Sequence, residues 1–143
     1  MRKNKSRKLN LGCGSNIQKG WINLDKSKIK GVDIAHDLDR YPWPFPGNYF
    51  EEVYSSDVIE HLNDLFMAMQ ELHRISKNGA KIRLIVPYWH SSAAFYPNHN
   101  YFFNIDSMKF FTEKERTYDS FYGFRLENIR LIPSRIGWII PPI

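Results

Sequence analysis

The chain has 143 residues and a mass of 17.0 kDa, with 43% hydrophobic and 24% charged residues, which is typical of one globular domain and excludes a disordered or fibrous protein. Its only cysteine, Cys13, excludes a disulfide scaffold. No segment approaches the roughly 18 apolar residues that a membrane-spanning helix needs. Met1 is followed by a basic segment rather than the apolar run of a signal peptide, so we expect a cytoplasmic protein without a transmembrane segment.

The positive charge of the chain is concentrated at its N-terminus. Twenty Lys and Arg against fifteen Asp and Glu give a net charge of +5, and residues 9–143 are formally neutral. We predict a disordered basic arm over residues 1–8 and a single domain over residues 9–143. Nucleic-acid enzymes usually carry a basic stripe on the folded surface, so we do not expect nucleic acid as a partner. Binding of the arm to nucleic acid or to an acidic membrane stays open as the alternative. The charges of the arm are Arg2, Lys3, Lys5, Arg7 and Lys8.

The first third of the chain predicts short strands separated by turns. A glycine turn, Gly12-Cys13-Gly14-Ser15-Asn16, follows the first strand, and a proline-rich loop over residues 42–47 precedes the fourth. Only six residues, Ser15 to Gly20, separate the glycine turn from the second strand, which predicts a reduced first helix. The predicted strands are Lys8–Leu11, Trp21–Asp25, Val32–Ala35 and Phe50–Ser55.

The rest of the chain predicts helices and further strands. Apolar residues at three- and four-residue steps predict a helix that begins at Asn63 or Asp64 and ends at Asn78-Gly79. A clear strand, Ala80–Val86, follows, and then an irregular polar and aromatic loop over residues 88–104. Beyond it we predict a helix over 106–115, a strand over 124–132 and an apolar end over 136–143.

This alternation of strands with helical or loop crossovers predicts an α/β, Rossmann-like, doubly wound fold. We expect a mostly parallel sheet with flanking helices, a reduced first helix and a shortened C-terminus. In such sheets ligands bind at the carboxyl ends of the strands. Gly12 and Gly14 let backbone approach a ligand, Asp25 can accept both hydroxyls of a ribose, and Asp37-Leu38 offers a carboxylate and an apolar side chain to a purine.

Successive motifs of the chain resemble those of class I S-adenosylmethionine-dependent methyltransferases, in particular the short methyltransferase type 11-like proteins. The resemblance covers roughly residues 8–111, and the order and spacing of the motifs carry it. Two departures concern the first motif: Asn10 replaces an acidic residue of many relatives, and Ser15-Asn16 replaces a further glycine. The motifs are Leu9–Ser15, Ile22–Asp25, His36–Leu38, Tyr41–Phe45, Phe50–Leu62 and Glu71–Ala80.

The resemblance implies a cofactor, S-adenosyl-L-methionine, that leaves as S-adenosyl-L-homocysteine, and it implies roles for particular residues. The turn Gly12-Cys13-Gly14 would lie along the methionine part of the cofactor. Asp25 would hold the ribose hydroxyls. The remaining implied contacts are Asp37 and Leu38 with adenine, and Ser56 and Asp57 with the methionine end and the substrate.

The implied reaction needs mainly placement, because the sulfonium methyl group is already activated. We expect the acceptor to be a hydroxyl of a small molecule or glycan, and an alcohol needs a base during attack. The candidate bases are His61, His90 and His99. We expect the aromatic loop over residues 88–103 to line the substrate site. The five histidines show no metal-ligand spacing, so we expect no metal.

The sequence also allows other functions to be compared with a methyltransferase. A Rossmann oxidoreductase would have its third glycine where Ile17 stands, and its acidic residue later than Asp25. The lone cysteine lies in the glycine turn, which argues against a methylation mechanism with a covalent cysteine intermediate. No Asn/Asp-Pro-Pro-Tyr motif follows the fourth strand, which argues against methylation of an amino group. A truncated cofactor-binding module without catalysis, and a nucleic-acid methyltransferase that uses the basic arm, stay open. The apolar residues Ile139, Ile140 and Ile143 predict a homodimer or membrane-surface contact.

Overall fold

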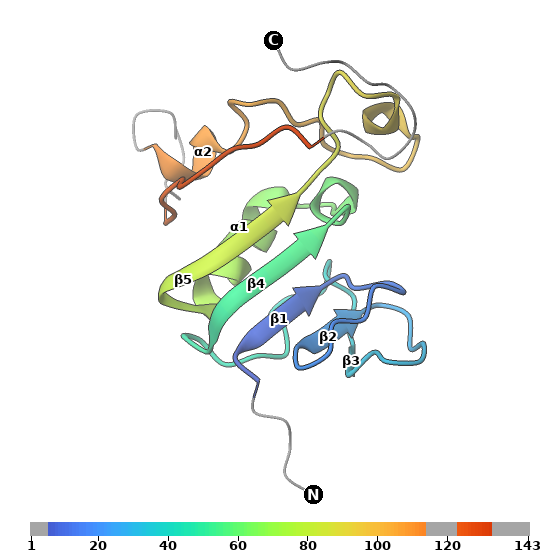
Figure 1. The fold of residues 1–143 in the computed structure, drawn as a ribbon, viewed down its shortest axis with the longest axis vertical. Helices are drawn as coiled ribbons and strands as arrows, with labels where there is room; N and C mark the ends of the chain where they lie inside the picture. The colour runs from blue at the N-terminus through green and yellow to red at the C-terminus, as the bar shows by residue number, and fades with distance from the viewer. Residues whose placement is uncertain (1–5, 114–122, 133–143) are drawn as a thin grey trace, which may run out of the picture.

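The computed structural model describes residues 6–113 and 123–132, and its centre is a sheet of five parallel strands (Figure 1). The strands lie in the order β3-β2-β1-β4-β5, so chain order reverses between β1 and β4, as in Rossmann-like folds. The predicted α/β, Rossmann-like fold is confirmed. The strands are β1 (Lys8–Leu11), β2 (Ile22–Asp25), β3 (Ile34–Ala35), β4 (Phe50–Ser56) and β5 (Ser76–Ile85).

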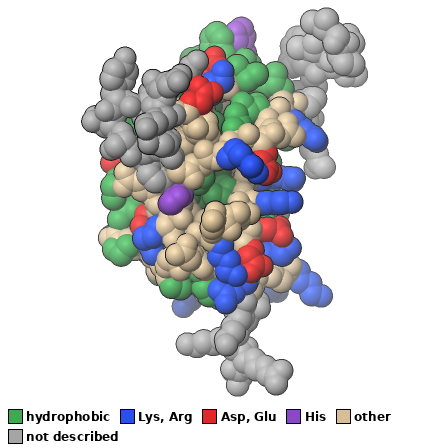
Figure 2. Space-filling model, turned by 90° about the vertical axis from the view of Figure 1, so that its left-hand side faces the viewer, with side chains coloured by type: hydrophobic (Ala, Val, Ile, Leu, Met, Phe, Trp, Pro, Cys, Tyr) green, Lys and Arg blue, Asp and Glu red, His purple; other side chains and the backbone are tan. Residues whose placement is uncertain are grey.

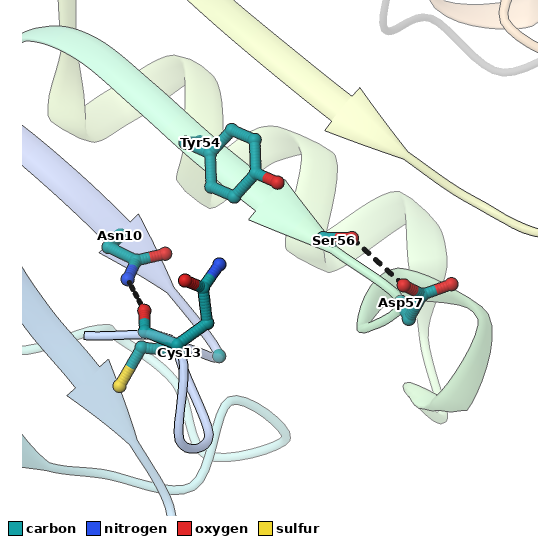
Figure 3. Close-up of a pocket in the computed structure, with 7 residues that line it drawn as sticks. Asn10, Cys13, Tyr54, Ser56 and Asp57 are labelled. Atoms are coloured by element: carbon teal, nitrogen blue, oxygen red, sulfur yellow. Dashed lines mark hydrogen bonds between the residues drawn. The ribbon is translucent and has the colours of Figure 1, made fainter. Parts of the chain in front are cut away.

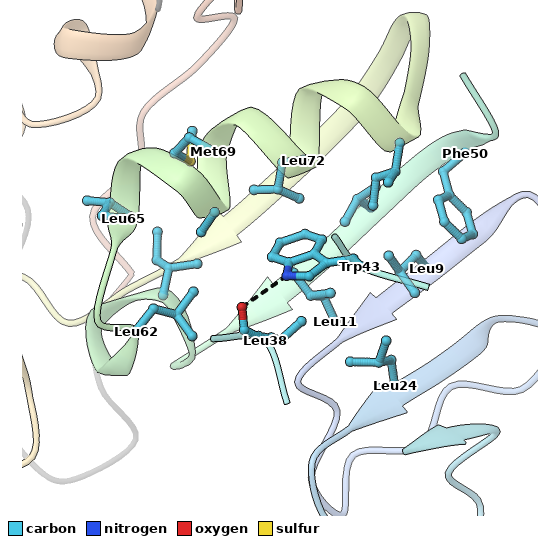
Figure 4. Packing of buried hydrophobic residues seen from close by; sticks show 14 of the residues in the cluster. Leu9, Leu11, Leu24, Leu38, Trp43, Phe50, Leu62, Leu65, Met69 and Leu72 are labelled. Atoms are coloured by element: carbon cyan, nitrogen blue, oxygen red, sulfur yellow. Dashed lines mark hydrogen bonds between the residues drawn. The ribbon is translucent and has the colours of Figure 1, made fainter. Parts of the chain in front are cut away.

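One long helix, α1 (Leu65–Ile75), covers one face of the sheet and forms the core with it (Figure 4). It begins where the sequence predicts, because Asp64 caps it by accepting a hydrogen bond from the backbone N–H of Met67 at 2.9 Å. The other described helical segments are η1 (Ile59–His61), η2 (Ser92–Phe95) and α2 (Lys109–Thr112). Residues of the core between α1 and the sheet include Leu9, Leu11, Leu24, Trp43, Phe50, Leu72 and Ile75.

The opposite face of the sheet carries polar side chains. Side chains alternate along a strand, so Leu9 and Leu11 point into the core while Lys8 and Asn10 point to the other face. Lys8 forms an ion pair with Glu52 there at 2.8 Å. The charged side chains of this face suit it to contact with water, whereas Asn10 and Asn23 on the same face are buried. The strand register places Asn23, Tyr54, Lys81 and Arg83 on the same face.

A network of side-chain amides occupies the place of the first helix. Asn10 and Asn23 are buried, at 1% and 3% exposed. The Asn10 amide donates to the backbone oxygen of Asn16 at 2.7 Å and to Asn23 Oδ1 at 2.9 Å. Asn23 Oδ1 also accepts from the N–H of Gln18, and Asp33 accepts from the N–H of Asn23. An acid at position 10 has no N–H to donate to these oxygens, which explains why asparagine replaces it in a chain with a short β1–β2 connection.

The boundary between α1 and β5 lies earlier than predicted. Helix α1 ends at Ile75, not at Asn78-Gly79, and β5 begins at Ser76 rather than at Ala80. The cause is pairing with the neighbouring strand: Phe50 of β4 lies beside Ser76 in the sheet. A sheet partner therefore overrides the local glycine signal.

The C-terminal part differs more from the sequence prediction. Of the helix predicted over 106–115, the described residues form only α2, because the Asn104 side chain forms a local turn by accepting from the N–H of Asp106. Residues 114 and 115 lie outside the described residues. Residues 124–132 lie in the described part of the chain and do not form the predicted strand, because none of them pairs with a strand of the sheet. The predicted disordered arm over residues 1–8 extends too far, because Lys8 belongs to β1 and lies beside Glu52 of β4 in the sheet. Residues 1–5 of the arm and the apolar end over 136–143 lie outside the described residues. Within the described ranges, no helix reaches the length and apolarity needed to cross a bilayer.

Candidate active site

A pocket of about 290 Å³ lies where chain order reverses, at the carboxyl ends of β1 and β4 (Figure 3). This is the place at which open α/β sheets bind their ligands. Gly12 and Cys13 from the turn after β1 form one side, and Ser56 and Asp57 at the end of β4 form the other. The remaining lining residues are Asn10, Asn16 and Tyr54.

The glycine turn has the backbone shape that only glycine adopts readily. Gly12 and Gly14 have φ values of 64° and 49°. An added Cβ at Gly12 would also lie 2.4 Å from a methyl group of Val58, so this position needs glycine for space as well. The thiol of Cys13 points away from Ser56 and Asp57 (Figure 3), and burial, aided by the charge of Asp25, raises the pKa of that thiol. Cys13 therefore contributes backbone and a neutral side chain.

Asp25 is the last residue of β2, as predicted, and its carboxylate stabilises the glycine turn by a hydrogen bond. Its Oδ2 accepts from the N–H of Gly14 at 2.8 Å, and its Oδ1 accepts from the N–H of Ser27 at 2.9 Å. A carboxylate offers about four lone-pair sites, so roughly two sites of Asp25 are free for ribose hydroxyls. Asp25 therefore shapes the turn and keeps acceptor capacity, although neither Asp25 nor Gly14 is among the residues that line the pocket at the end of β1.

Asp37 and Leu38 have different surroundings. The side chain of Leu38 is 7% exposed and packs in the core, and its backbone oxygen accepts from the indole N–H of Trp43 at 3.0 Å (Figure 4). The side chain of Asp37 is 48% exposed, and its carboxylate accepts from the N–H of Asp39. Neither residue lines the pocket at the end of β1. Asp37 has the accessible polar group of the two, whereas Leu38 positions Trp43.

Asp57 joins this pocket to a second one. Its φ of 55° is unusual for a residue other than glycine, and such backbone conformations cluster at functional sites. Ser56 Oγ donates to Asp57 Oδ2 at 2.8 Å, and the N–H of Asp57 is held by the backbone oxygen of Ile85. Asp57 lines both pockets, so a ligand in one lies next to a ligand in the other.

The second pocket, of about 320 Å³, contains two of the three predicted histidines. The rings of His61 and His99 meet edge to face with their centres 4.5 Å apart. His90 does not line either pocket, and its ring packs against Trp89 at 3.9 Å. The other lining residues, besides Asp57, are Glu60, Pro87, Ala93, Tyr96 and Asn98.

The loop that carries His99 is tied to η1 by Asn100. The N–H of Asn100 donates to the backbone oxygen of Glu60 at 2.7 Å, and its side-chain amide donates to those of His61 and Leu62 at 3.0 and 3.2 Å. The Tyr101 hydroxyl adds a bond to the backbone oxygen of Asn63. These bonds bring together two histidines that lie far apart in the sequence.

Replacing Asn100 with alanine is expected to loosen this loop. The variant loses two donated side-chain hydrogen bonds, and a typical net contribution is about 1 kcal/mol each. We expect cleavage of the loop by a protease under native conditions to become several-fold faster. The matched control is Asn98→Ala, because Asn98 contacts His61 through its backbone oxygen. Equal cleavage rates for the two variants would show that the Asn100 side chain does not hold the loop.

Glu60 is the residue of this site that the sequence prediction missed. It is fully buried, and neither of its carboxylate oxygens accepts a hydrogen bond from any of the described residues. Burial raises the pKa of Glu60, and the nearby charge of Asp57 adds to the rise. An acidic residue directly before His61, at the turn after a buried strand, is the sequence signal that points to it.

The strand order, the glycine turn after β1 and the acid at the end of β2 are those of the α/β domains that bind nucleoside cofactors. A family profile described as "Methyltransferase domain" matches residues 13–84, half of the chain. The chain belongs to the class I S-adenosylmethionine-dependent methyltransferases, and the family predicted from its motifs is confirmed. Searches of curated proteins and of solved structures each found no match.

Proposed function

We propose that this protein transfers a methyl group from S-adenosyl-L-methionine to a hydroxyl group of a small molecule or glycan. The observation that carries the proposal is the pair of adjoining pockets, one beside the glycine turn and one beside His61 and His99, with Asp57 in both. A cofactor in the first pocket and an acceptor in the second would meet at the end of β4.

The residues of the first pocket fit this cofactor. The positive φ of Gly12 leaves backbone free of a side chain along the pocket. Asp25 is not among the lining residues, but it is bonded to the N–H of Gly14 in the same turn and has acceptor sites for a ribose. S-adenosylmethionine supplies, when bound, an activated methyl group on a sulfonium. Ser56 and Asp57 offer an adjacent hydroxyl and carboxylate to the polar end of that ligand.

The second pocket supports an acceptor that loses a proton. His61 directs Nδ1 at the backbone oxygen of Asn98 and His99 directs Nδ1 at that of Ala94, at 3.0 and 3.2 Å. A carbonyl oxygen only accepts, so in the neutral rings Nδ1 carries the hydrogen and Nε2 has a free electron pair. Either Nε2 can take the hydroxyl proton while the new oxygen–carbon bond forms and the sulfur–methyl bond breaks. The exposed ring of Tyr96 lines the same pocket and offers a stacking surface to a sugar.

The main alternative is a cofactor-binding module without catalysis. The second pocket argues against it, since a binding module has no need for two tethered histidines beside the cofactor pocket. Methylation of nucleic acid finds less support. On the face shown in Figure 2, Lys and Arg side chains are interspersed with Asp and Glu rather than joined into a basic stripe.

Calorimetric titration with S-adenosylmethionine and S-adenosylhomocysteine tests the proposal. We expect micromolar binding that Asp25→Ala weakens by at least about tenfold, since the variant loses the ribose acceptor and the brace on Gly14. NADH is the control ligand and is expected not to bind. Failure of the folded protein to bind either sulfur ligand would favour the degenerate module or a different cofactor.

A further inference from the structure

Three potential metal ligands converge on the second pocket. One ligand atom each from Glu60, His61 and His99 lies within 4.8 Å of the other two. The distance between His61 Nε2 and Glu60 Oε1 is 4.0 Å, which is too long for a hydrogen bond. Two ligands at about 2.1 Å from one ion lie roughly 3.4 Å apart at the tetrahedral angle, so this pair needs to close by only about half an ångström to hold an ion.

The two imidazoles are oriented as metal ligands are. Each ring holds its Nδ1 against a backbone oxygen, that of Asn98 for His61 and that of Ala94 for His99. Metal-binding histidines typically donate their second ring N–H to a carbonyl or carboxylate in this way, which fixes the ring and raises the basicity of the other nitrogen. The side chain of Asn100 holds the backbone of η1, so the orientation of His61 is supported from outside the cluster.

The buried side chain of Glu60 is independent evidence that a cation binds at this site. Its side chain is 1% exposed and its two oxygens have no hydrogen-bond donor among residues 6–113 and 123–132. A buried carboxylate without a partner is costly, and buried charges are normally paired or bind a metal. When both imidazoles are neutral and Glu60 is ionised, each of the three side chains presents an electron pair and none donates a hydrogen bond to another.

We propose that Glu60, His61 and His99 bind a divalent first-row transition-metal ion such as Zn²⁺ or Co²⁺. Two imidazoles and one carboxylate are a donor set that suits these ions, whereas Mg²⁺ and Ca²⁺ prefer oxygen ligands. Three protein ligands leave a coordination position open toward the pocket, which is typical of catalytic rather than structural metal sites. The sequence spacing predicts no metal, because it does not show that the loop returns to η1.

The proposed site deepens the proposed function and, in its catalytic part, rests on it. A divalent ion at the open position would hold an acceptor oxygen and lower the pKa of its hydroxyl. The two histidines would then act as ligands, and the metal would perform the activation that a free imidazole performs without it. Binding of the ion itself does not depend on the methyl transfer, so the two can be tested separately.

The test uses the full-length protein freed of metal by a chelator and titrated with Co²⁺ while its visible absorption is followed. We expect one equivalent to bind and produce ligand-field bands, and Zn²⁺ to displace it. Glu60→Gln and His99→Gln are each expected to weaken binding by at least about tenfold. His90→Gln is the matched control, since His90 comes from the same loop but lies outside the pocket. Displacement by equimolar Mg²⁺ would overturn the proposed class of ion.

Thermal unfolding provides a second measurement that also reports whether the variants fold. Zn²⁺ is expected to raise the Tm of the wild-type protein and of His90→Gln, and to leave Glu60→Gln unchanged. Without metal, Glu60→Gln is expected to be at least as stable as the wild type, because an amide costs less to bury than an unpaired carboxylate. Zero stoichiometry, or equal Co²⁺ affinity in all variants, would overturn the site.

Titration with S-adenosylmethionine on the same samples separates the two proposals. Cofactor binding without metal binding would overturn the metal site and leave the proposed function standing. Metal binding without cofactor binding would keep the site and overturn its role in methyl transfer. A thiolate-to-cobalt absorption band would also overturn the assignment, because it would place the ion on Cys13.

Discussion

Replacing Gly12 with alanine is expected to destabilise the protein by about 2–5 kcal/mol and to abolish binding of S-adenosylmethionine. The new Cβ would lie 2.4 and 2.8 Å from the two methyl groups of Val58, at a φ of 64° that side chains rarely adopt. Val58 follows Asp57, the residue that lines both pockets. Relief of the clash therefore displaces the turn after β4, where cofactor and acceptor sites adjoin.

Gly14→Ala is the matched control for Gly12→Ala. Gly14 has a similarly positive φ of 49°, but an added Cβ would meet no described atom within 4 Å. This variant isolates backbone strain, so we expect a loss of about 1–2 kcal/mol. Urea unfolding gives both free energies, and calorimetry gives both cofactor affinities.

Combination of Gly12→Ala with Val58→Ala tests the cause directly. The double variant removes the methyl groups that the new Cβ meets and keeps the backbone strain. We expect it to recover part of the stability and part of the cofactor binding of Gly12→Ala. Equal losses for Gly12→Ala and Gly14→Ala, or no recovery in the double variant, would show that contact with Val58 is not the reason for glycine at position 12.

The strands around the cofactor pocket could be predicted because their signals are local. A run of apolar residues ended by Gly12, and another ended by Asp25, place these residues at strand ends without any knowledge of tertiary contacts. The chain order of the sheet follows from the family that these motifs define. Local signals fail at the start of β5, where pairing with β4 overrides Gly79.

The second pocket could not be predicted, because it depends on a contact between distant segments. Nothing in the spacing of His61 and His99 shows that Asn100 ties one loop to the other. The burial of Leu38 in the core, where its backbone oxygen accepts from Trp43, likewise depends on packing that the sequence does not show. The position of a residue at a strand end follows from the order of the strands, whereas the positions of His61, His99 and Leu38 depend on contacts between distant segments.

Replacing Glu71 with alanine is expected to destabilise the protein by about 2–4 kcal/mol. Glu71 lies on the core side of α1 at 7% exposed, and its carboxylate accepts from the backbone N–H of Trp43 at 2.7 Å and from the Arg74 guanidinium at 2.6 and 2.7 Å. Arg74 in turn donates to the backbone oxygens of Trp43 and Phe45. The pair fixes the loop that seats Trp43 in the core. Arg74 is 36% exposed, so water screens part of its charge and moderates the loss.

The effect of Glu71→Ala is expected to diminish in acid. Burial alone would raise the pKa of Glu71, but the hydrogen bonds from Arg74 and Trp43 and the charge of Arg74 hold it below the ordinary 4.5. A carboxyl group with a lowered pKa in the folded state stabilises the protein above its unfolded pKa, and this stabilisation is lost as the pH falls through the folded pKa. Urea unfolding of wild type and variant at neutral pH and below the folded pKa measures the difference. Gln70→Ala, at an exposed position of the same helix, is the control for helix propensity and is expected to be nearly neutral. A difference in stability that stays constant down to acid would show that the charge of Glu71 does not contribute to it.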